Sequence, residues 1–237
     1  MTTKRLKPIV WGLGIATAVA MLVTLYLGLV WSPPERSMGE SIRILYFHAP
    51  SAWASYLAIG VVAVASILYL WRRTRIWDVI ALASAEIGVL FTTITLISGM
   101  LWGKLEWGTY WTWDARLTSF LIMWLIYVGY LMLRAAIDDP ERRARLAAIV
   151  GIIGALDIPI IHFAVLWWRT LHPQPIVVRP GGPAMSEPMI VALVAGMVAF
   201  TLLYLFLVTF RVSLELERDQ VEVAEHRQAV TAEAQPG

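Results

Sequence analysis

The chain has 237 residues, of which 59% are hydrophobic and only 15% are charged, and its mean hydropathy is +0.68. A soluble domain carries about a quarter charged residues, so this composition excludes an ordinary soluble protein and indicates a chain whose solvent is lipid. The chain has no cysteine, which excludes disulfides and thiolate chemistry, and its net charge of +2 gives no basic field for nucleic acid.

Six apolar stretches are long enough to span a bilayer, since a spanning helix takes roughly 20 mostly apolar residues. In chain order they cover residues 9–30, 46–70, 79–101, 117–133, 146–168 and 189–210, and the fourth can be extended to 136. The first is longer than the apolar core of a secretory signal and has no small-residue cleavage site, so we interpret it as a retained helix. The sequence therefore predicts an all-α integral membrane protein with six transmembrane helices.

The basic residues predict how these helices are oriented, because cytoplasmic loops carry an excess of Lys and Arg. Thirteen of the 19 basic residues lie in the two terminal segments and in the loops near 72–75 and 134–145, and six lie in the alternate loops. We therefore expect both termini in the cytoplasm of a bacterium. The loops 31–45, 102–116 and 169–188 are expected on the periplasmic face of the inner membrane.

The chain is expected to divide into two parts. Residues 1–212 would form a single membrane domain that contains all six helices. Residues 213–237 are charged and lack a long apolar run, so we expect a cytoplasmic tail that continues the last helix and is partly disordered.

The second periplasmic loop carries the densest aromatic cluster, WGKLEWGTYWTWDARLTS, which runs from Trp102 to Ser119. A belt of interfacial aromatics is one interpretation, but a belt would be spread over both membrane surfaces, and the other surface has only three tryptophans. Gly103 and Gly108 would allow turns and the close approach of a flat partner. The tryptophans between them offer broad, stackable faces.

The end of this cluster carries charge. Asp114 is a candidate cap of the helix that begins near Ala115, and Arg116 could pair either with Asp114 or with an acidic group of a ligand. A cap with an interfacial ion pair and a role in ligand binding both stay open. The segment has no nucleophile–base pair. It is therefore typical of a platform for a large planar ligand with a charged edge, and not of an enzyme's active site.

Two of the four histidines lie on the same expected face as the tryptophan cluster. His48 begins the second stretch in YFHAPSAW, and His172 follows the fifth in WWRTLHPQP. Two histidines that flank an aromatic platform are candidates for the axial ligands of a porphyrin iron. His162, close to Asp157 in the fifth stretch, is interpreted as a neutral imidazole that bonds a neighbouring helix, although an intramembrane ionisable group is also a functional candidate.

The tryptophan-rich segment resembles the WWD signature of a superfamily of haem-handling membrane proteins. Together with IRILYFHAPSAW, DARLTS and IPIIHFAVLWWRTLH, it makes nearly the whole chain similar to the CcmC family of cytochrome c-type biogenesis proteins, also called haem exporter protein C. The resemblance implies that haem b is bound transiently at the periplasmic face and presented to the haem chaperone CcmE. The small membrane protein CcmD and the ABC transporter subunits CcmA and CcmB are further implied partners.

The resemblance also implies a site. His48 and His172 would be the axial ligands of the haem iron. The haem platform would consist of the matching signature residues Trp102, Gly103, Trp107, Gly108, Trp111, Trp113, Asp114 and Arg116. The sequence departs from the family pattern at Leu105, Glu106 and Tyr110, where the family often has Pro, an apolar residue and Trp.

Two other classes of protein stay open. A permease subunit of a haem-exporting transporter would line a path through the bilayer with polar groups, and the membrane interior offers Glu86, Asp157 and His162 for that purpose. A membrane cytochrome of the b type would bury paired histidines within its helices, and His162 alone does not supply a pair.

Overall fold

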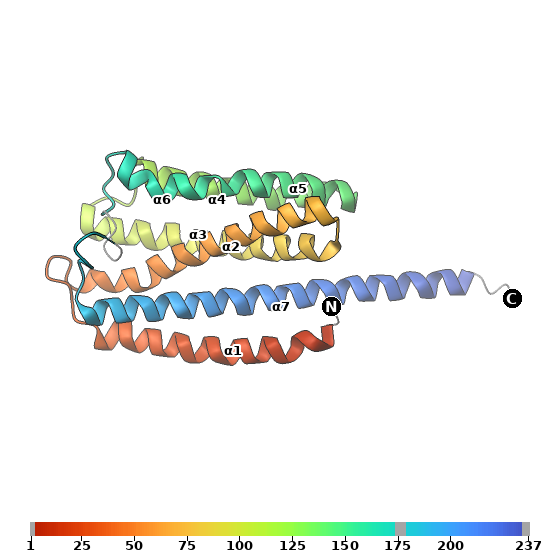
Figure 1. The fold of residues 1–237 in the computed structure, drawn as a ribbon, viewed down its shortest axis with the longest axis horizontal. Coiled ribbons are helices and arrows are strands. Elements are labelled where there is room, and N and C mark those ends of the chain that lie inside the picture. The colour runs from red at the N-terminus through yellow and green to blue at the C-terminus, as the bar shows by residue number, and fades with distance from the viewer. Residues whose placement is uncertain (1–2, 174–178, 234–237) are drawn as a thin grey trace.

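A computed structural model of the chain describes residues 3–173 and 179–233, and the fold of this part is helical. The long helices are α1 (Thr3–Tyr26), α2 (Leu45–Arg72), α3 (Arg75–Trp107), α4 (Ala115–Ala136), α5 (Pro140–Ala155), α6 (Asp157–Trp167) and α7 (Glu187–Glu233). A π-helical turn, η1 (Leu27–Trp31), extends α1, and a 3-10 turn, η2 (Glu40–Ile44), precedes α2. Figure 1 shows a bundle of roughly parallel helices beyond which α7 projects at one end.

Six of the described helical segments are long and apolar enough to cross a membrane. They are Leu6–Trp31, Glu40–Arg72, Arg75–Trp107, Ala115–Ala136, Pro140–Trp167 and Glu187–Glu225. The predicted stretches fall within these segments, apart from residue 168, so the prediction of an all-α membrane protein with six spanning helices is confirmed. The fourth helix extends to Ala136, as its composition allowed.

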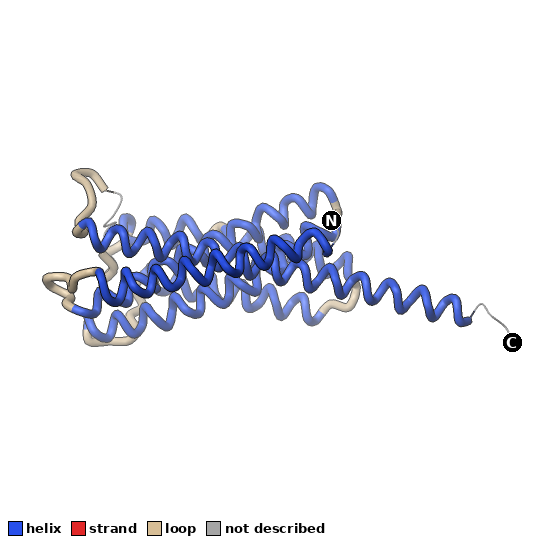
Figure 2. Tube along the Cα trace, turned by 90° about the horizontal axis from the view of Figure 1, so that it is seen from below, coloured by secondary structure: helices blue, strands red, loops and turns tan. Residues whose placement is uncertain are grey.

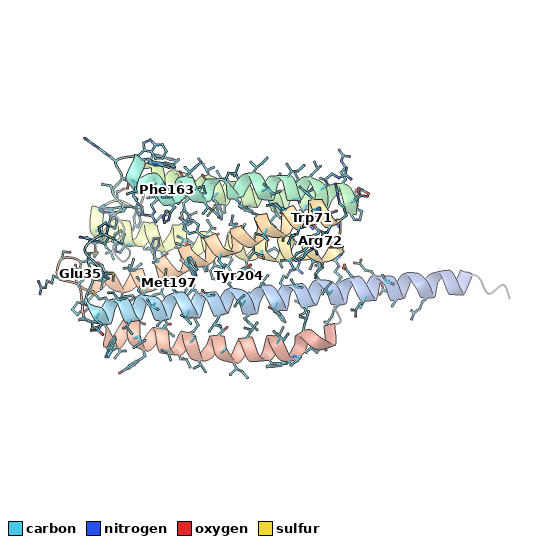
Figure 3. The ribbon with its side chains drawn as sticks, viewed as in Figure 1. Glu35, Trp71, Arg72, Phe163, Met197 and Tyr204 are labelled. Atoms are coloured by element: carbon cyan, nitrogen blue, oxygen red, sulfur yellow. The ribbon has the colours of Figure 1, made fainter. Side chains whose placement is uncertain are left out.

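The two ends of the bundle differ (Figures 1 and 2). One end carries residues 32–44, 108–114, 168–173 and 179–186, and we call it the loop end. The other carries both ends of the chain and the short turns at 73–74 and 137–139, and we call it the terminal end. In Figure 3, Glu35 marks the loop end, whereas Trp71 and Arg72 mark the terminal end.

The fifth spanning segment is two helices instead of the single helix that its apolar run suggests. Pro159 has no N–H to donate and its ring crowds the carbonyl one turn earlier, so a continuous helix is not favoured here. The chain breaks at Leu156, whose N–H donates to Ile153 O at 3.1 Å in a tighter turn. The break makes Asp157 the first residue of α6, where its side chain is buried.

Small residues let the helices pack closely. A Cβ at Gly196 of α7 would lie 2.8 Å from Pro50 Cγ and 2.9 Å from Tyr46 O of α2. A Cβ at Gly154 of α5 would lie 2.7 Å from Ile126 Cγ2 of α4. In a membrane, where lipid is as apolar as the side chains, such close contacts hold helices together through van der Waals packing.

The terminal end is joined by a network of charged side chains from α3, α4 and α7. Its members are Arg75, Asp78, Glu86, Arg134, Arg211, Glu215 and Asp219. Arg134 makes a bidentate pair with Asp78 at 2.5 and 3.0 Å, and both side chains are buried. Glu86 accepts two hydrogen bonds from Arg211, which gives this intramembrane carboxylate a structural partner.

The last helix continues well past the bundle. The segment 213–233, which was expected to be partly disordered, is helical in the structure, and residues 234–237 lie outside the described part. The expected helical extension is therefore present. The division of the chain at 212 remains a prediction.

Candidate functional site

The signature segment, residues 102–119, begins as helix and turns sharply at one glycine. Its first six residues are the last turns of α3, which ends at Gly108 in the left-handed conformation with φ +75°. A residue with a Cβ is strained there, so Gly108 permits the turn as expected. Gly103 is helical and buried, and a Cβ there would lie 3.2 Å from the Trp107 ring, so this glycine makes room for the ring.

Asp114 connects the next helix to the candidate ligand His172. One carboxylate oxygen accepts the Leu117 N–H at 2.9 Å, which confirms the cap of α4. The other oxygen lies 3.5 Å from His172 Nδ1, and both side chains are largely buried. Burial alone would raise the pKa of Asp114, but the nearby His172 ring and the Leu117 N–H outweigh it and lower that pKa. The group facing His172 is therefore a carboxylate.

His172 is held by an aromatic ring as well. The Trp107 ring lies edge-on to the His172 ring, with centroids 5.2 Å apart, and Trp107 in turn lies edge-on to Trp102 at 5.2 Å. The chain that follows α6 is thus fixed against the end of α3. Arg116, the other candidate partner of Asp114, makes no ion pair with it in the part of the chain that the structure describes.

His48 lies one turn into α2, slightly deeper than the expected helix start. Its Nδ1 is 3.1 Å from the hydroxyl of Ser98 on α3. A Cβ on the adjacent Gly99 would lie 3.0 Å from His48 Cε1, so the imidazole rests directly on the glycine. His48 interacts electrostatically with His172 and Arg116, so the two predicted ligands and the predicted arginine lie in one neighbourhood.

The signature tryptophans form two edge-to-face pairs in place of one flat surface. Trp102 pairs with Trp107 at an interplanar angle of 75°, and Trp111 pairs with Trp113 at 80°. The first pair and Trp111 are half-buried, whereas Trp113 is 76% exposed. The cluster therefore has an inner part beside His172 and an outer part that projects from the protein.

Buried polar atoms without partners gather at this site. Four of them have no hydrogen-bond partner among the described residues: Trp102 Nε1, Trp111 Nε1, Thr112 Oγ1 and Thr118 Oγ1. Two more, Asp114 Oδ2 and His172 Nδ1, face each other at 3.5 Å. A buried polar group that lacks a partner costs about 1–3 kcal/mol, and such groups are uncommon in native proteins. Their concentration fits a region that binds a partly polar ligand.

The first loop is folded on itself and anchored to this region. The Glu35 carboxylate accepts from Ser37 and from the Met38 N–H at 2.8 Å, and these hydrogen bonds, those from Ser37 first, lower its pKa to about 2. Glu106, one of the departures from the family pattern, accepts a hydrogen bond from Ser41 and so ties η2 to the end of α3.

The arginines at the loop end are not equivalent. Arg43 donates to Gly28 O at 2.9 Å and pairs with Glu40, so its guanidinium fastens the first loop to η1. Arg179 is exposed. Neither Arg116 nor Arg179 has an ion pair to any residue that the structure describes, which leaves both available for an anionic group.

The expectation for His162 is wrong. Its side chain is exposed on α6, its ring contacts the adjacent Phe163, and it makes no hydrogen bond to a neighbouring helix within the described part of the chain. Ser98 and Gly99 were not predicted as site residues. Ser98 is four residues before Trp102 on the same helical face, which places it near the signature segment but does not indicate its contact with His48.

Comparisons with known proteins identify relatives of the whole chain. The model of the family described as Heme exporter protein C matches residues 1–227. A Heme exporter protein C of Bradyrhizobium diazoefficiens is 40% identical over 227 residues, which are 96% of this chain and 85% of that protein. The Heme exporter protein C of Escherichia coli is 40% identical over 177 residues, or 73% of this chain and 72% of that protein. A ccmC-like mitochondrial protein of Marchantia polymorpha, named for cytochrome c biosynthesis, is 40% identical over 71% of each chain.

Proposed function

Because the chain belongs to the heme exporter protein C family, we propose that it binds haem at the loop end and delivers it for cytochrome c maturation. His48 and His172 are the axial ligands of the iron in this proposal. Haem b is cargo that is held transiently. The protein is a binding and delivery surface and catalyses no reaction of its own.

The observation that carries the proposal is the pair of imidazoles at the loop end, each with a polar partner on its Nδ1 side. A porphyrin fills four positions around iron and leaves two for axial ligands, so two histidines are sufficient. Within the described ranges, no group of three or more His, Asp or Glu side chains is arranged to hold a bare metal ion. The donor set therefore suits haem better than a free cation.

The signature residues supply the surroundings of the porphyrin in this proposal. They are Trp102, Gly103, Trp107, Gly108, Trp111, Trp113, Asp114 and Arg116. The half-buried tryptophans offer apolar surface, and the unpartnered indole N–H groups of Trp102 and Trp111 offer donors at its edge. Arg116 is the first candidate to neutralise a propionate, since it lies near His48 and has no ion pair of its own among the described residues.

The loop end faces the periplasm in this proposal, in a bacterial inner membrane. The two termini lie at the opposite end, and 13 of the 19 basic residues belong to the segments at that end. Basic residues are retained on the cytoplasmic side. Haem would then be held where a periplasmic partner reaches it.

The receiving partner in this proposal is the haem chaperone CcmE, and CcmD, CcmA and CcmB complete the assembly. The exposed outer part of the tryptophan cluster, above all Trp113, is the surface on which the chaperone meets the haem edge. The helical tail after residue 212 projects from the terminal end and would lie in the cytoplasm.

Transfer to the chaperone tests this function in cells. CcmE is co-expressed with the wild-type chain, with His48→Ala, with His172→Ala and with His162→Ala, and haem bound covalently to CcmE is measured by haem staining after denaturing electrophoresis. We expect stained CcmE with the wild type and with His162→Ala, an exposed histidine outside the site, and none with the other two variants. Equal staining with all four chains would contradict the proposal and favour a permease subunit.

A further inference from the structure

We propose that Ser98 and Asp114 are positioning residues that fix the tautomers of His48 and His172, so that Nε2 of each ring is free for the iron. This inference rests on the proposed function and deepens it. It concerns the protein's own side chains behind the two ligands, on the side away from the haem. Ligating histidines characteristically use their second ring nitrogen to donate to such a partner, which fixes the ring and raises its basicity.

The hydrogen of the Ser98 hydroxyl is already used within α3. The Ser98 hydroxyl donates to Ile94 O at 2.7 Å, one turn back in α3. A hydroxyl has a single hydrogen, so towards His48 Nδ1, 3.1 Å away, the Ser98 oxygen is an acceptor. Nδ1 must then carry the imidazole proton, and the lone pair of the neutral ring lies on Nε2.

Asp114 faces His172 as a hydrogen-bond acceptor. A carboxylate has no hydrogen to donate, and one of its oxygens is already used by the Leu117 N–H. The other oxygen faces His172 Nδ1 at 3.5 Å, at the limit of a hydrogen bond, so the favourable tautomer has its proton on Nδ1. The same residue thus caps α4 and orients His172.

The residue after Ser98 also limits where the His48 ring can lie. Gly99 follows Ser98 in α3, and a Cβ there would lie 3.0 Å from Cε1, the carbon between the two ring nitrogens. The imidazole can lie this close to α3 because that position has no side chain. Ser98 and Gly99 therefore act together: Ser98 fixes the position of the proton, and Gly99 leaves room for the ring beside α3.

The two partners make the two ligands unequal. His48 has a neutral hydroxyl behind it, whereas His172 has a carboxylate. A carboxylate raises the basicity of the imidazole more than a neutral acceptor does. In this proposal His172 is the stronger ligand of the pair, and His48 dissociates from the iron first when haem leaves.

The test is a haemin titration of the full chain in detergent, in which binding is monitored by absorption and the affinity is measured. Ser98→Ala and Asp114→Asn are each expected to weaken binding about 10–100-fold, the range for residues behind a metal ligand. Ser98→Thr keeps the hydroxyl and should restore binding. Asn caps helices about as well as Asp, so Asp114→Asn keeps α4 while presenting an amide to His172. Asp139→Asn, at the corresponding cap of α5, is the matched control and should bind as wild type does.

A second measurement separates positioning from general damage. Ser98→Ala is combined with His48→Ala, and haemin is titrated with imidazole added to replace the missing ligand. If Ser98 acts only through His48, the double variant binds as His48→Ala does, because interacting residues are not additive. A further loss in the double variant would overturn the proposed role of Ser98.

The remaining outcomes are decisive. The wild-type chain could bind haemin through two histidines while Ser98→Ala and Asp114→Asn both bind it with wild-type affinity. That result would overturn this inference and leave the proposed function intact. A wild type that binds no haemin would overturn the proposed function and this inference with it.

Discussion

The two ends of the bundle differ in whether their buried polar groups have hydrogen-bond partners. At the terminal end, Arg134 and Asp78 are buried together and joined by two hydrogen bonds, and Arg75 adds a third to the same carboxylate. At the loop end, the described residues include buried indole and hydroxyl groups to which no other described residue bonds. The buried charged groups at the terminal end are paired with one another, whereas several buried indole and hydroxyl groups at the loop end have no partner among the described residues.

The difference indicates which end is built for stability and which for binding. Removal of one partner of a buried ion pair strongly destabilises a protein, because the other charge is left buried without compensation. The charge network at the terminal end therefore holds α3, α4 and α7 together. Unpartnered buried groups lower the stability of a protein and are kept where they serve a ligand. Substitutions at the two ends should therefore have effects of opposite sign on the stability of the haem-free protein.

The largest effect is expected at the terminal end. Asp78→Ala leaves the buried Arg134 without its carboxylate and should cost about 3–5 kcal/mol. This loss of stability is measured by thermal unfolding in detergent, which is monitored through the loss of the monomer peak in gel filtration. Glu141→Ala removes an exposed pair with Arg145 and should change stability by less than about 1 kcal/mol. Equal stabilities of the two variants would show that the charge network does not hold this end together.

The opposite sign is expected at the loop end. Thr118→Val replaces a buried hydroxyl that has no partner in the described part of the chain with a methyl group of the same shape. It should stabilise the haem-free protein by about 1–3 kcal/mol, since the cost of the unpaired hydroxyl is removed. Thr92→Val is the control, because the Thr92 hydroxyl is also buried but donates to Gly88 O at 2.7 Å. A lower unfolding temperature for Thr118→Val than for Thr92→Val would contradict the comparison.

A third prediction separates binding from stability at a single glycine. Gly99→Ala places a methyl group against the His48 ring and should weaken haemin binding about tenfold, or about 1.4 kcal/mol. The haem-free protein should not lose stability, because Ala is favoured over Gly within a helix by about 1 kcal/mol. Gly129→Ala on α4 meets no atom within 4 Å and should leave binding unchanged. Haemin titration of both variants decides whether haem binding through the His48 imidazole depends on the absence of a side chain at Gly99.

The smallest effect concerns two tryptophans with nearly the same exposure. Trp113 at the loop end is 76% exposed and Trp71 at the terminal end is 73% exposed. Trp113→Ala should leave haemin affinity within a few-fold of wild type but lower the amount of haem that reaches CcmE, whereas Trp71→Ala should change neither. Quantitative haem staining of co-expressed CcmE compares them, and equal transfer by the two variants would remove Trp113 from the delivery surface.

Much of the fold could be predicted from the sequence because membrane helices are specified locally. Twenty apolar residues between charged turns predict a span without knowledge of its neighbours. The cap by Asp114 was predictable for the same reason, since it involves only residues three positions apart. The break before Pro159 was visible in the sequence as a proline, but the long apolar run around it concealed two helices.

The contacts that were not predicted join distant parts of the chain. No local pattern indicates that Ser98 meets His48, or that Asp114 faces His172 as well as capping α4. The pairing of Glu86 with Arg211 depends in the same way on the packing of α3 against α7. His162 was misassigned because composition alone does not say which face of α6 is turned outward.

The absorption spectrum of the purified full chain, expressed with its chaperone partner, tests the central claim most directly. Wild type is compared with His48→Ala, His172→Ala and the control His162→Ala. The account predicts a haem Soret band in wild type and in His162→Ala that is lost or shifted in the other two variants. An unchanged band in both His48→Ala and His172→Ala would contradict the assignment of the axial ligands and, with it, the interpretation of the loop end as the haem site.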